Sequence, residues 1–291
     1  MKKASLVAVK NILTIDVEDW FQVENYAPAI PRSTWAEKEL RVRRNVESIL
    51  DRLAASGTKA TFFTLGWIAD REGDLIRRIA REGHEIASHG WSHTPIWHLD
   101  RDEFREEIRS SRAILQDLSG QPVVGYRAPT FSVTEKTLWA LGELAEAGYT
   151  FDSSIFPVRH DRYGIPDSPT AIHRRGGLWE IPLSVYRLGS LNLPVAGGGY
   201  FRLYPLALTE RAIHRLNASG QPAVVYLHPW EFDPGQPKVA GVGLTATFRH
   251  RVGLGRNLAK LSRLLQDFVF GSASEVLATL APSSDRAGKA A

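Results

Sequence analysis

The chain has 291 residues, 43% of them hydrophobic, a composition that excludes a chain disordered throughout its length. Its net charge of +4 comes from 36 basic and 32 acidic residues that are interspersed, so we predict no nucleic-acid binding. The absence of cysteine excludes disulfide bonds.

The first apolar segment, over residues 6–16, follows two lysines and resembles the start of a signal peptide. Lys10 and Asn11 interrupt it, however, and it runs directly into acidic residues, so we expect a buried strand. No uninterrupted apolar run approaches the roughly 20 residues of a membrane span. We therefore expect a protein without a transmembrane segment that is located in the cytoplasm, at the membrane face if its substrate is attached to a lipid.

Helical and extended patterns alternate along the rest of the chain. Apolar residues at helical spacing predict helices over residues 38–55, 73–82 and 255–270, and a capping box of Asp100 with Glu103 opens another helix. The further predicted elements are strands over residues 58–65, 84–89, 122–129, 149–152, 178–182 and 222–228, a helix opened by a capping box of Ser132 with Glu135, a glycine-rich turn at 197–202, a helix over 205–218 and a loop over 234–253.

This order of strand, helix and strand indicates a mainly parallel sheet, either a barrel or a doubly wound sheet. The composition shows no domain boundary, so we predict a single domain over residues 1–275 and a disordered tail over residues 276–291. Because the carboxyl ends of parallel strands meet at one edge, polar residues at those ends are candidates for a site. These residues are Asp16, His89, Arg127, Asp152 and His228.

Two histidines separated by three residues, His89 and His93, follow the third predicted strand. Gly90 lies between them and allows a tight turn, so both rings can face one point. Neutral imidazole is the commonest protein ligand of divalent transition metals, and two imidazoles with one carboxylate leave coordination positions open. We predict a catalytic metal site whose carboxylate is either Glu18 or Asp19.

The same strand ends supply groups for proton transfer. Asp16 is the candidate general base, and we expect Arg127 to pair with it and hold it ionised. His228 is the candidate general acid, because hydrolysis of an amide requires protonation of the departing nitrogen. Asp152 either orients Arg127 or His228 or caps the turn that follows it.

Taken together, five motifs resemble those of the NodB-like polysaccharide deacetylases, carbohydrate esterase family 4. The resemblance extends to the branch found with exosortase and exopolysaccharide gene clusters, and it covers about residues 10–270. The motifs stand in the family's order. They are Asp16-Val17-Glu18-Asp19, His89-Gly90-Trp91-Ser92-His93, Arg127-Ala128-Pro129, Asp152-Ser153-Ser154 and Leu227-His228-Pro229.

The resemblance implies a distorted (β/α) barrel of about seven strands and a divalent metal, zinc first, with cobalt or nickel as substitutes. It also implies removal of N-acetyl groups from the amino sugars of a polysaccharide or of its lipid-linked precursor. In that reaction Asp16 deprotonates a metal-bound water, a backbone N–H near Thr130 or Phe131 stabilises the oxyanion, and His228 protonates the leaving amine. The partner is an N-acetylated glycan, and the oligomeric state is left open.

One departure from the family pattern leaves alternatives. The usual first motif has two adjacent aspartates, whereas Val17 and Glu18 separate Asp16 from Asp19 here. This arrangement resembles a sub-branch that includes peptidoglycan deacetylases and metal-independent, allantoinase-like hydrolases. A small-molecule amidohydrolase and a non-catalytic glycan-binding barrel are therefore the alternative functions, although retention of both histidines of the second motif disfavours them.

Overall fold

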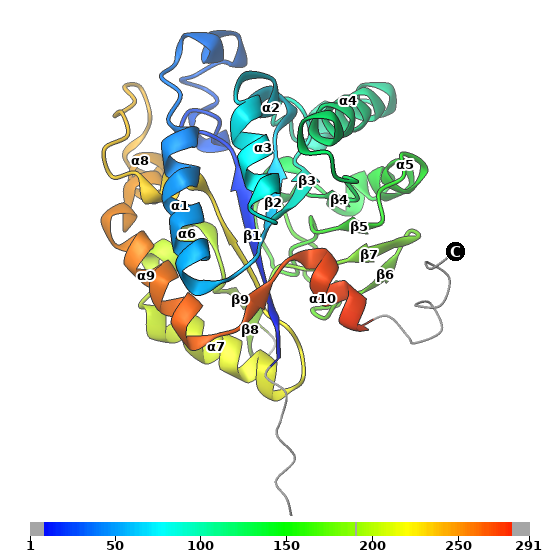
Figure 1. Cartoon of the computed structure of the whole chain (residues 1–291), viewed down its shortest axis with the longest axis vertical. Coiled ribbons are helices and arrows are strands. Elements are labelled where there is room, and N and C mark those ends of the chain that lie inside the picture. Colours follow the sequence, from blue (N-terminus) through cyan, green and yellow to red (C-terminus); the bar gives the residue numbers. More distant parts are fainter. Residues whose placement is uncertain (1–8, 190, 281–291) are drawn as a thin grey trace, which may run out of the picture.

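The computed structural model describes residues 9–189 and 191–280. At its centre lies a nine-stranded sheet with the strand order β10-β1-β2-β3-β4-β5-β7-β6, and β11 also pairs with β1 (Figure 1). Strands β8 and β9 form a separate two-stranded sheet. The strands are β1 (Asn11–Val17), β2 (Thr61–Thr64), β3 (Glu85–Ser88), β4 (Gly125–Tyr126), β5 (Phe151–Asp152), β6 (His173–Arg175), β7 (Leu178–Glu180), β8 (Val185–Leu188), β9 (Leu191–Pro194), β10 (Val224–Leu227) and β11 (Phe270–Gly271).

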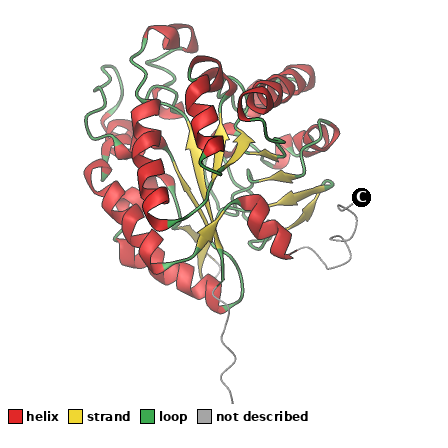
Figure 2. Cartoon of the chain, viewed as in Figure 1, coloured by secondary structure: helices red, strands yellow, loops and turns green. Residues whose placement is uncertain are grey.

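Helices surround the sheet, whose strands lie in the interior (Figure 2). Their buried faces are apolar: Val46, Ile49 and Leu53 of the first helix share one core cluster with Leu13 and Ile15 of β1. Full burial of such a side chain stabilises the fold by about 1.5–3 kcal/mol relative to exposure. The helices are α1 (Val42–Ser56), α2 (Gly66–Arg71), α3 (Gly73–Arg81), α4 (Arg101–Ser119), α5 (Ala140–Glu146), α6 (Gly198–Leu203), α7 (Leu206–Ala218), α8 (Leu244–Arg251), α9 (Leu254–Asp267) and α10 (Ala273–Leu280).

Neighbouring strands from β10 to β7 are parallel, so their carboxyl ends lie at one edge of the sheet. Within the described residues, β10 and β6 stand at opposite ends of the strand order, so the sheet is a curled half-barrel that stays open on one side. The predicted mainly parallel, distorted barrel is therefore confirmed. The parallel arrangement also explains why residues far apart in the sequence reach a single edge.

Capping residues determine where two helical segments begin. The capping box of Asp100 with Glu103 opens α4, as predicted. The box predicted at Ser132 is wrong, because Thr134 caps the following 3-10 turn together with Thr137. The hydroxyl of Ser132 instead accepts a hydrogen bond from the backbone N–H of Ile96, in the segment between β3 and α4.

The part of the chain from β6 to α8 differs most from the prediction. Residues 234–253 were predicted to be a loop, but they contain α8, in which His250 is the buried residue. A helix that buries so little of its surface has no apolar periodicity for a sequence reading to detect. Strand β6, which is antiparallel to β7, and the β8–β9 hairpin were not predicted either.

Helix α10 overlaps the predicted disordered tail, which was expected from residue 276. Val276 and Leu277 are buried in it, and the helix continues to Leu280. The rest of the predicted tail, residues 281–291, lies outside the described residues. Among the described helices, none is both long enough and apolar enough to span a membrane.

The packing of Gly125 in β4 against Phe151 in β5 gives a test of the fold. A Cβ atom added to Gly125 would lie 2.0 Å from the ring of Phe151, so we expect Gly125→Ala to reduce the free energy of unfolding by about 1–3 kcal/mol. Gly142, on helix α5, has open space around it, and Gly142→Ala should stabilise the protein by up to about 1 kcal/mol. Urea unfolding of both variants measures the two effects, and equal stabilities would contradict this packing.

Candidate active site

A cavity of about 660 Å³ opens at the edge where the parallel strands end. Asp16 near the end of β1, His89 after β3 and His228 after β10 all line it, and Glu18 and His93 lie beside them. The register of the sheet thus brings together five residues that the sequence motifs had singled out. Arg127, which the motifs also singled out, donates a hydrogen bond to Asp16.

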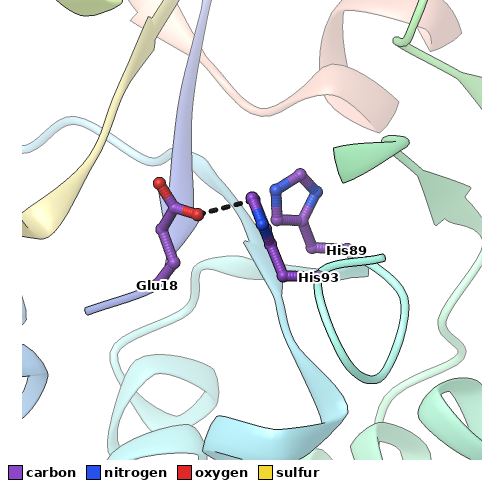
Figure 3. Close-up of side chains that lie close together, drawn as sticks. All are labelled: Glu18, His89 and His93. Atoms are coloured by element: carbon purple, nitrogen blue, oxygen red, sulfur yellow. Dashed lines mark ion pairs between the residues drawn. The ribbon is translucent and has the colours of Figure 1, made fainter. Parts of the chain in front are cut away.

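Glu18, His89 and His93 form a buried group that could hold a metal ion. Their ligand atoms all lie within 4.8 Å of one another, and Figure 3 shows the Glu18 carboxylate facing the two rings. Nε2 of His93 lies 2.7 Å from Oε2 of Glu18, an oxygen that accepts no hydrogen bond from the described residues. Two lone-pair atoms so close repel each other unless a proton or a cation lies between them. The donor set therefore fits a divalent ion of the zinc type.

A hydrogen bond and burial hold the ring of His89 in the form that can bind a metal ion. Nδ1 lies 2.7 Å from the backbone oxygen of Arg127, and because a carbonyl oxygen only accepts, Nδ1 carries the hydrogen and Nε2 keeps its lone pair. Burial lowers the pKa of His89 to about 4. The ring is therefore neutral at physiological pH, which is the form that binds metals.

The loop that carries the two histidines is held from helix α4. Oε2 of Glu107 accepts hydrogen bonds from the backbone N–H groups of Trp91, at 2.7 Å, and Ser92, at 3.0 Å. Gly90 and His93 adopt left-handed conformations, with φ of 76° and 54°. A positive φ is strained for a histidine, and here it turns the second ring back toward the first. Sequence reasoning missed Glu107, because nothing in the histidine motif indicates that a side chain of the next helix binds its backbone.

The structure distinguishes the two carboxylates that the sequence left open. Glu18 faces the histidines, and although burial acts to raise its pKa, His93 and His228 hold the pKa well below its usual range. Asp19 points away: its oxygens accept hydrogen bonds from the backbone N–H groups of Trp20, Arg41 and Val42, at 2.8, 2.6 and 2.8 Å. Asp19 thus caps α1, which explains why that helix begins at Val42 instead of residue 38. This placement replaces the prediction of Asp19 as a ligand.

Arg127 forms the predicted pair with Asp16. Its Nη1 atom lies 2.6 Å from Oδ1 of Asp16 and 2.7 Å from the hydroxyl of Thr14. On the other side, Nε and Nη2 donate to the backbone oxygen and the hydroxyl of Ser153. Arg127 is completely buried, so this arrangement fixes the position of the carboxylate.

His228 stands across the cavity from Asp16. Its Nε2 atom lies 3.8 Å from Oδ2 of Asp16 and 3.6 Å from Oε1 of Glu18. On its other side Glu231 accepts a hydrogen bond from the backbone N–H of His228, and Arg202 contacts that glutamate at 2.9 Å. Burial acts to lower the pKa of His228, but Glu231, Glu18 and Asp16 together raise it to about 9. The ring can therefore carry a proton at neutral pH.

Glu231, to which the sequence assigned no role, and Trp230, a tryptophan next to the fifth motif, are neighbours of His228. Nε1 of Trp230 donates to Oε1 of Glu18 at 3.0 Å, and the indole stacks on His228 with 5.3 Å between ring centroids. The same indole also stacks on His250. The signal was present in the motif, because a glutamate three residues after a histidine at a strand end can reach back to it.

Asp152 takes the turn-capping role that was one of its predicted alternatives. It accepts hydrogen bonds from the backbone N–H and the hydroxyl of Ser154, and that hydroxyl accepts from the backbone N–H of Ala128. Its neighbour on the paired strand β7 is Glu180, which is also buried. Burial raises the pKa of Glu180 well above its usual value, and the charge of Asp152 raises it further. The proximity of the two carboxyl groups therefore disfavours ionisation of both at once.

Fold and side chains together define an α/β half-barrel with a candidate metal centre at its strand ends. Residues 35–151 match the polysaccharide deacetylase family, and residues 153–278 match a domain of unknown function, DUF3473, which is consistent with the exopolysaccharide-associated branch. Residues 35–151 therefore carry the NodB-like polysaccharide deacetylase domain, carbohydrate esterase family 4, that the motifs indicated.

Named relatives are similar over the part of the chain that carries the histidine motif. The peptidoglycan-N-acetylglucosamine deacetylase of Bacillus cereus is 39% identical over 93 residues, which are 32% of this chain and 34% of that protein. The chitin deacetylase of Pestalotiopsis sp is 35% identical over 117 residues, which are 39% of each chain. The chain thus matches only about a third of the length of these curated relatives.

Solved structures share the fold over nearly the whole chain. A presumed polysaccharide deacetylase from Mycobacterium smegmatis has a TM-score of 0.60 and 21% identity, over 95% of this chain and 92% of that chain. A family 4 carbohydrate esterase from Bacillus anthracis has a TM-score of 0.50 and 18% identity, over 94% of this chain and 84% of that chain. Both similarities show a common half-barrel fold.

Matched amide substitutions separate the roles of the adjacent carboxylates. We expect Glu18→Gln to weaken zinc binding at least about tenfold, because it removes a charged ligand. Asp19→Asn should leave zinc affinity unchanged but reduce the free energy of unfolding by about 1–2 kcal/mol, because it puts an amide donor against backbone donors. Titration with zinc and urea unfolding measure the two effects. Loss of zinc binding in Asp19→Asn alone would reverse the assignment.

The buried carboxyl pair makes stability depend on pH. Because folding raises the pKa of Glu180, its contribution to stability is complete below about pH 4.5 and is lost as the pH rises toward the raised value. Glu180→Gln cannot ionise, so we expect the variant to gain stability relative to wild type between about pH 5 and 8, by up to about 1.4 kcal/mol per pH unit. Urea unfolding at three pH values measures this gain.

The control is Glu143→Gln, because the hydrogen bond from Arg105 lowers the pKa of Glu143, the opposite direction. That variant should differ from wild type by a constant amount over the same range, because a carboxyl with a lowered pKa is ionised in both the folded and the unfolded state above about pH 5. A constant difference between Glu180→Gln and wild type would show that folding does not raise the pKa of Glu180.

Proposed function

We propose that this protein is a metal-dependent hydrolase that removes N-acetyl groups from the amino sugars of a polysaccharide or of its lipid-linked precursor. The observation that carries the proposal is that Nε2 of His228 lies 3.8 Å from Oδ2 of Asp16. Both residues lie beside the group of Glu18, His89 and His93. A paired base and acid next to a metal-ligating group is more than glycan binding requires. The names of the relatives, which act on peptidoglycan and chitin, support the same chemistry.

Glu18, His89 and His93 would hold the metal, with zinc as the expected ion and cobalt or nickel as substitutes. Such an ion, when bound, polarises the acetamide carbonyl and lowers the pKa of water. The neutral ring of His89 and the charge of Glu18 are the protein's contribution to holding it. The same set of ligands distinguishes this proposal from a metal-independent, allantoinase-like hydrolase.

Asp16 is the proposed base. Arg127 holds one of its oxygens, so the other faces the cavity and can take a proton from the attacking water. The water oxygen bonds to the acetyl carbon, the carbon–nitrogen bond breaks, and His228 gives its proton to the departing amine. The products are acetate and a free amino sugar.

The backbone near Thr130 would stabilise the negative oxygen that develops during attack. Of the two predicted donors, the N–H of Phe131 already donates to the backbone oxygen of Ala128, at 3.1 Å. Thr130 is therefore the remaining candidate; it lines the cavity and has a positive φ of 57°. Such strain is typical of backbone that is shaped for a catalytic contact.

We further propose that both matched segments form one catalytic domain, as predicted for residues 1–275. The histidine motif belongs to the segment over residues 35–151, whereas His228 belongs to the segment over residues 153–278. Strand β1 pairs with β2 of the first segment and with β10 of the second. Neither segment alone would contain both the metal-ligating histidines and the acid.

Acetate release from N-acetylglucosamine oligomers, measured with zinc present, tests the proposal. We expect Asp16→Asn and His228→Gln each to reduce kcat by about 100-fold or more, because each removes a proton-transfer step. His214→Gln, which changes an exposed histidine on α7, is the matched control and should retain full activity. A chelator should abolish activity and added zinc should restore it.

Two outcomes would contradict this function. Full activity in both Asp16→Asn and His228→Gln would remove the base and the acid from the reaction. Tight glycan binding without acetate release, with zinc, cobalt or nickel present, would favour the non-catalytic glycan-binding barrel.

A further inference from the structure

The cavity does not end at the metal-ligating group but extends to a wall of arginines. Arg159 and Arg162 from the loop after β5, and Arg249 from α8, line the same cavity as Asp16 and His228. All three arginines are exposed. They come from two segments far apart in the sequence, so the fold gathers them at one place. We call these three residues the arginine wall.

The loop that carries two of these arginines has a defined shape. Gly164 has a φ of 100°, and a Cβ atom there would lie 2.2 Å from the backbone oxygen of Val158. The ring of His160 stacks on Tyr163 with 3.8 Å between centroids. Nη2 of Arg162 donates to Oδ1 of Asn25 at 3.0 Å, which ties the loop to the opposite side of the cavity. These contacts hold Arg162 and the loop around it in place.

Positive charge exceeds negative charge at this wall. Glu24 and Asp161 also line the cavity, so the three arginines exceed these two acids by one charge. The acids deeper in the cavity already have partners, since Asp16 pairs with Arg127 and Glu231 with Arg202. Burial lowers the pKa of His160; Asp161 acts to raise it, whereas Arg162 and Arg249 lower it.

We propose that the arginine wall binds a negatively charged group of the glycan, so that the substrate is an acidic glycan with a carboxylate or phosphate near the N-acetylated sugar. This inference rests on the proposed function. A guanidinium group offers paired donors that match both anions. Phe248, which is 59% exposed and lines the same cavity, adds an aromatic face beside Arg249 for a sugar ring.

Three substrates distinguish the source of the charge. They are a neutral N-acetylglucosamine tetramer, an oligosaccharide in which N-acetylglucosamine alternates with glucuronic acid, and a phosphorylated N-acetylglucosamine oligomer. With zinc-loaded protein, we expect kcat/KM for at least one charged substrate to exceed that for the neutral one by about tenfold, the size of a charge-assisted contact. Added salt should reduce this preference.

Substitutions connect the preference to the wall. Arg162→Gln and Arg249→Gln should each lower the ratio of charged to neutral kcat/KM about five- to tenfold, mostly through KM. The matched control is Arg109→Gln, an exposed arginine on α4, and it should leave the ratio unchanged. Binding of the preferred charged oligosaccharide to the Asp16→Asn variant, measured by calorimetry, should weaken by the same factor when either wall arginine is replaced.

The outcomes separate this inference from the function it rests on. Equal kcat/KM values for charged and neutral substrates would overturn the acidic-glycan inference and leave the deacetylase function standing. Absence of acetate release from all three substrates would overturn the function. In that case, calorimetry still decides the role of the wall, because equal binding of charged and neutral oligosaccharides would refute it.

Discussion

The rest of the site depends on one buried guanidinium, that of Arg127. A charge without contact with water is tolerated when it is paired and hydrogen-bonded, and here Asp16, Thr14 and Ser153 supply a partner for each of its three nitrogens. The backbone oxygen of the same residue fixes the tautomer of His89. Asp16 and His89, the proposed base and a proposed metal ligand, are thus both positioned by Arg127, the first through its guanidinium group and the second through its backbone oxygen.

Much of this site could be predicted from the sequence, because a parallel sheet brings the carboxyl ends of its strands to one edge. Asp16, His89, Arg127 and His228 each follow or end a different strand, and that rule alone predicts their convergence. The choice between Glu18 and Asp19 could not be made in the same way. It depends on where α1 begins, since the backbone N–H groups at that point bind Asp19.

The residues that sequence reasoning missed act through partners far away in the chain. Glu107 holds a loop from a neighbouring helix, and Glu180 lies opposite Asp152 only because β7 pairs with β5. Neither has a local pattern, since their environments are created by tertiary structure. Helix α8 escaped prediction for a related reason: it buries little of its surface, so its residues carry no apolar repeat, although they bring Arg249 to the cavity.

Trp230 connects the two sides of the cavity, because it contacts both Glu18 and His228. Its indole donates to Glu18 and stacks on His228, so any rotation of the ring would shift both residues together. A substitution that moves Trp230 to widen the cavity beside His228 would therefore also move Glu18. Substitutions are consequently better tolerated at the outer rim of the cavity than at its floor, where Trp230 contacts both Glu18 and His228.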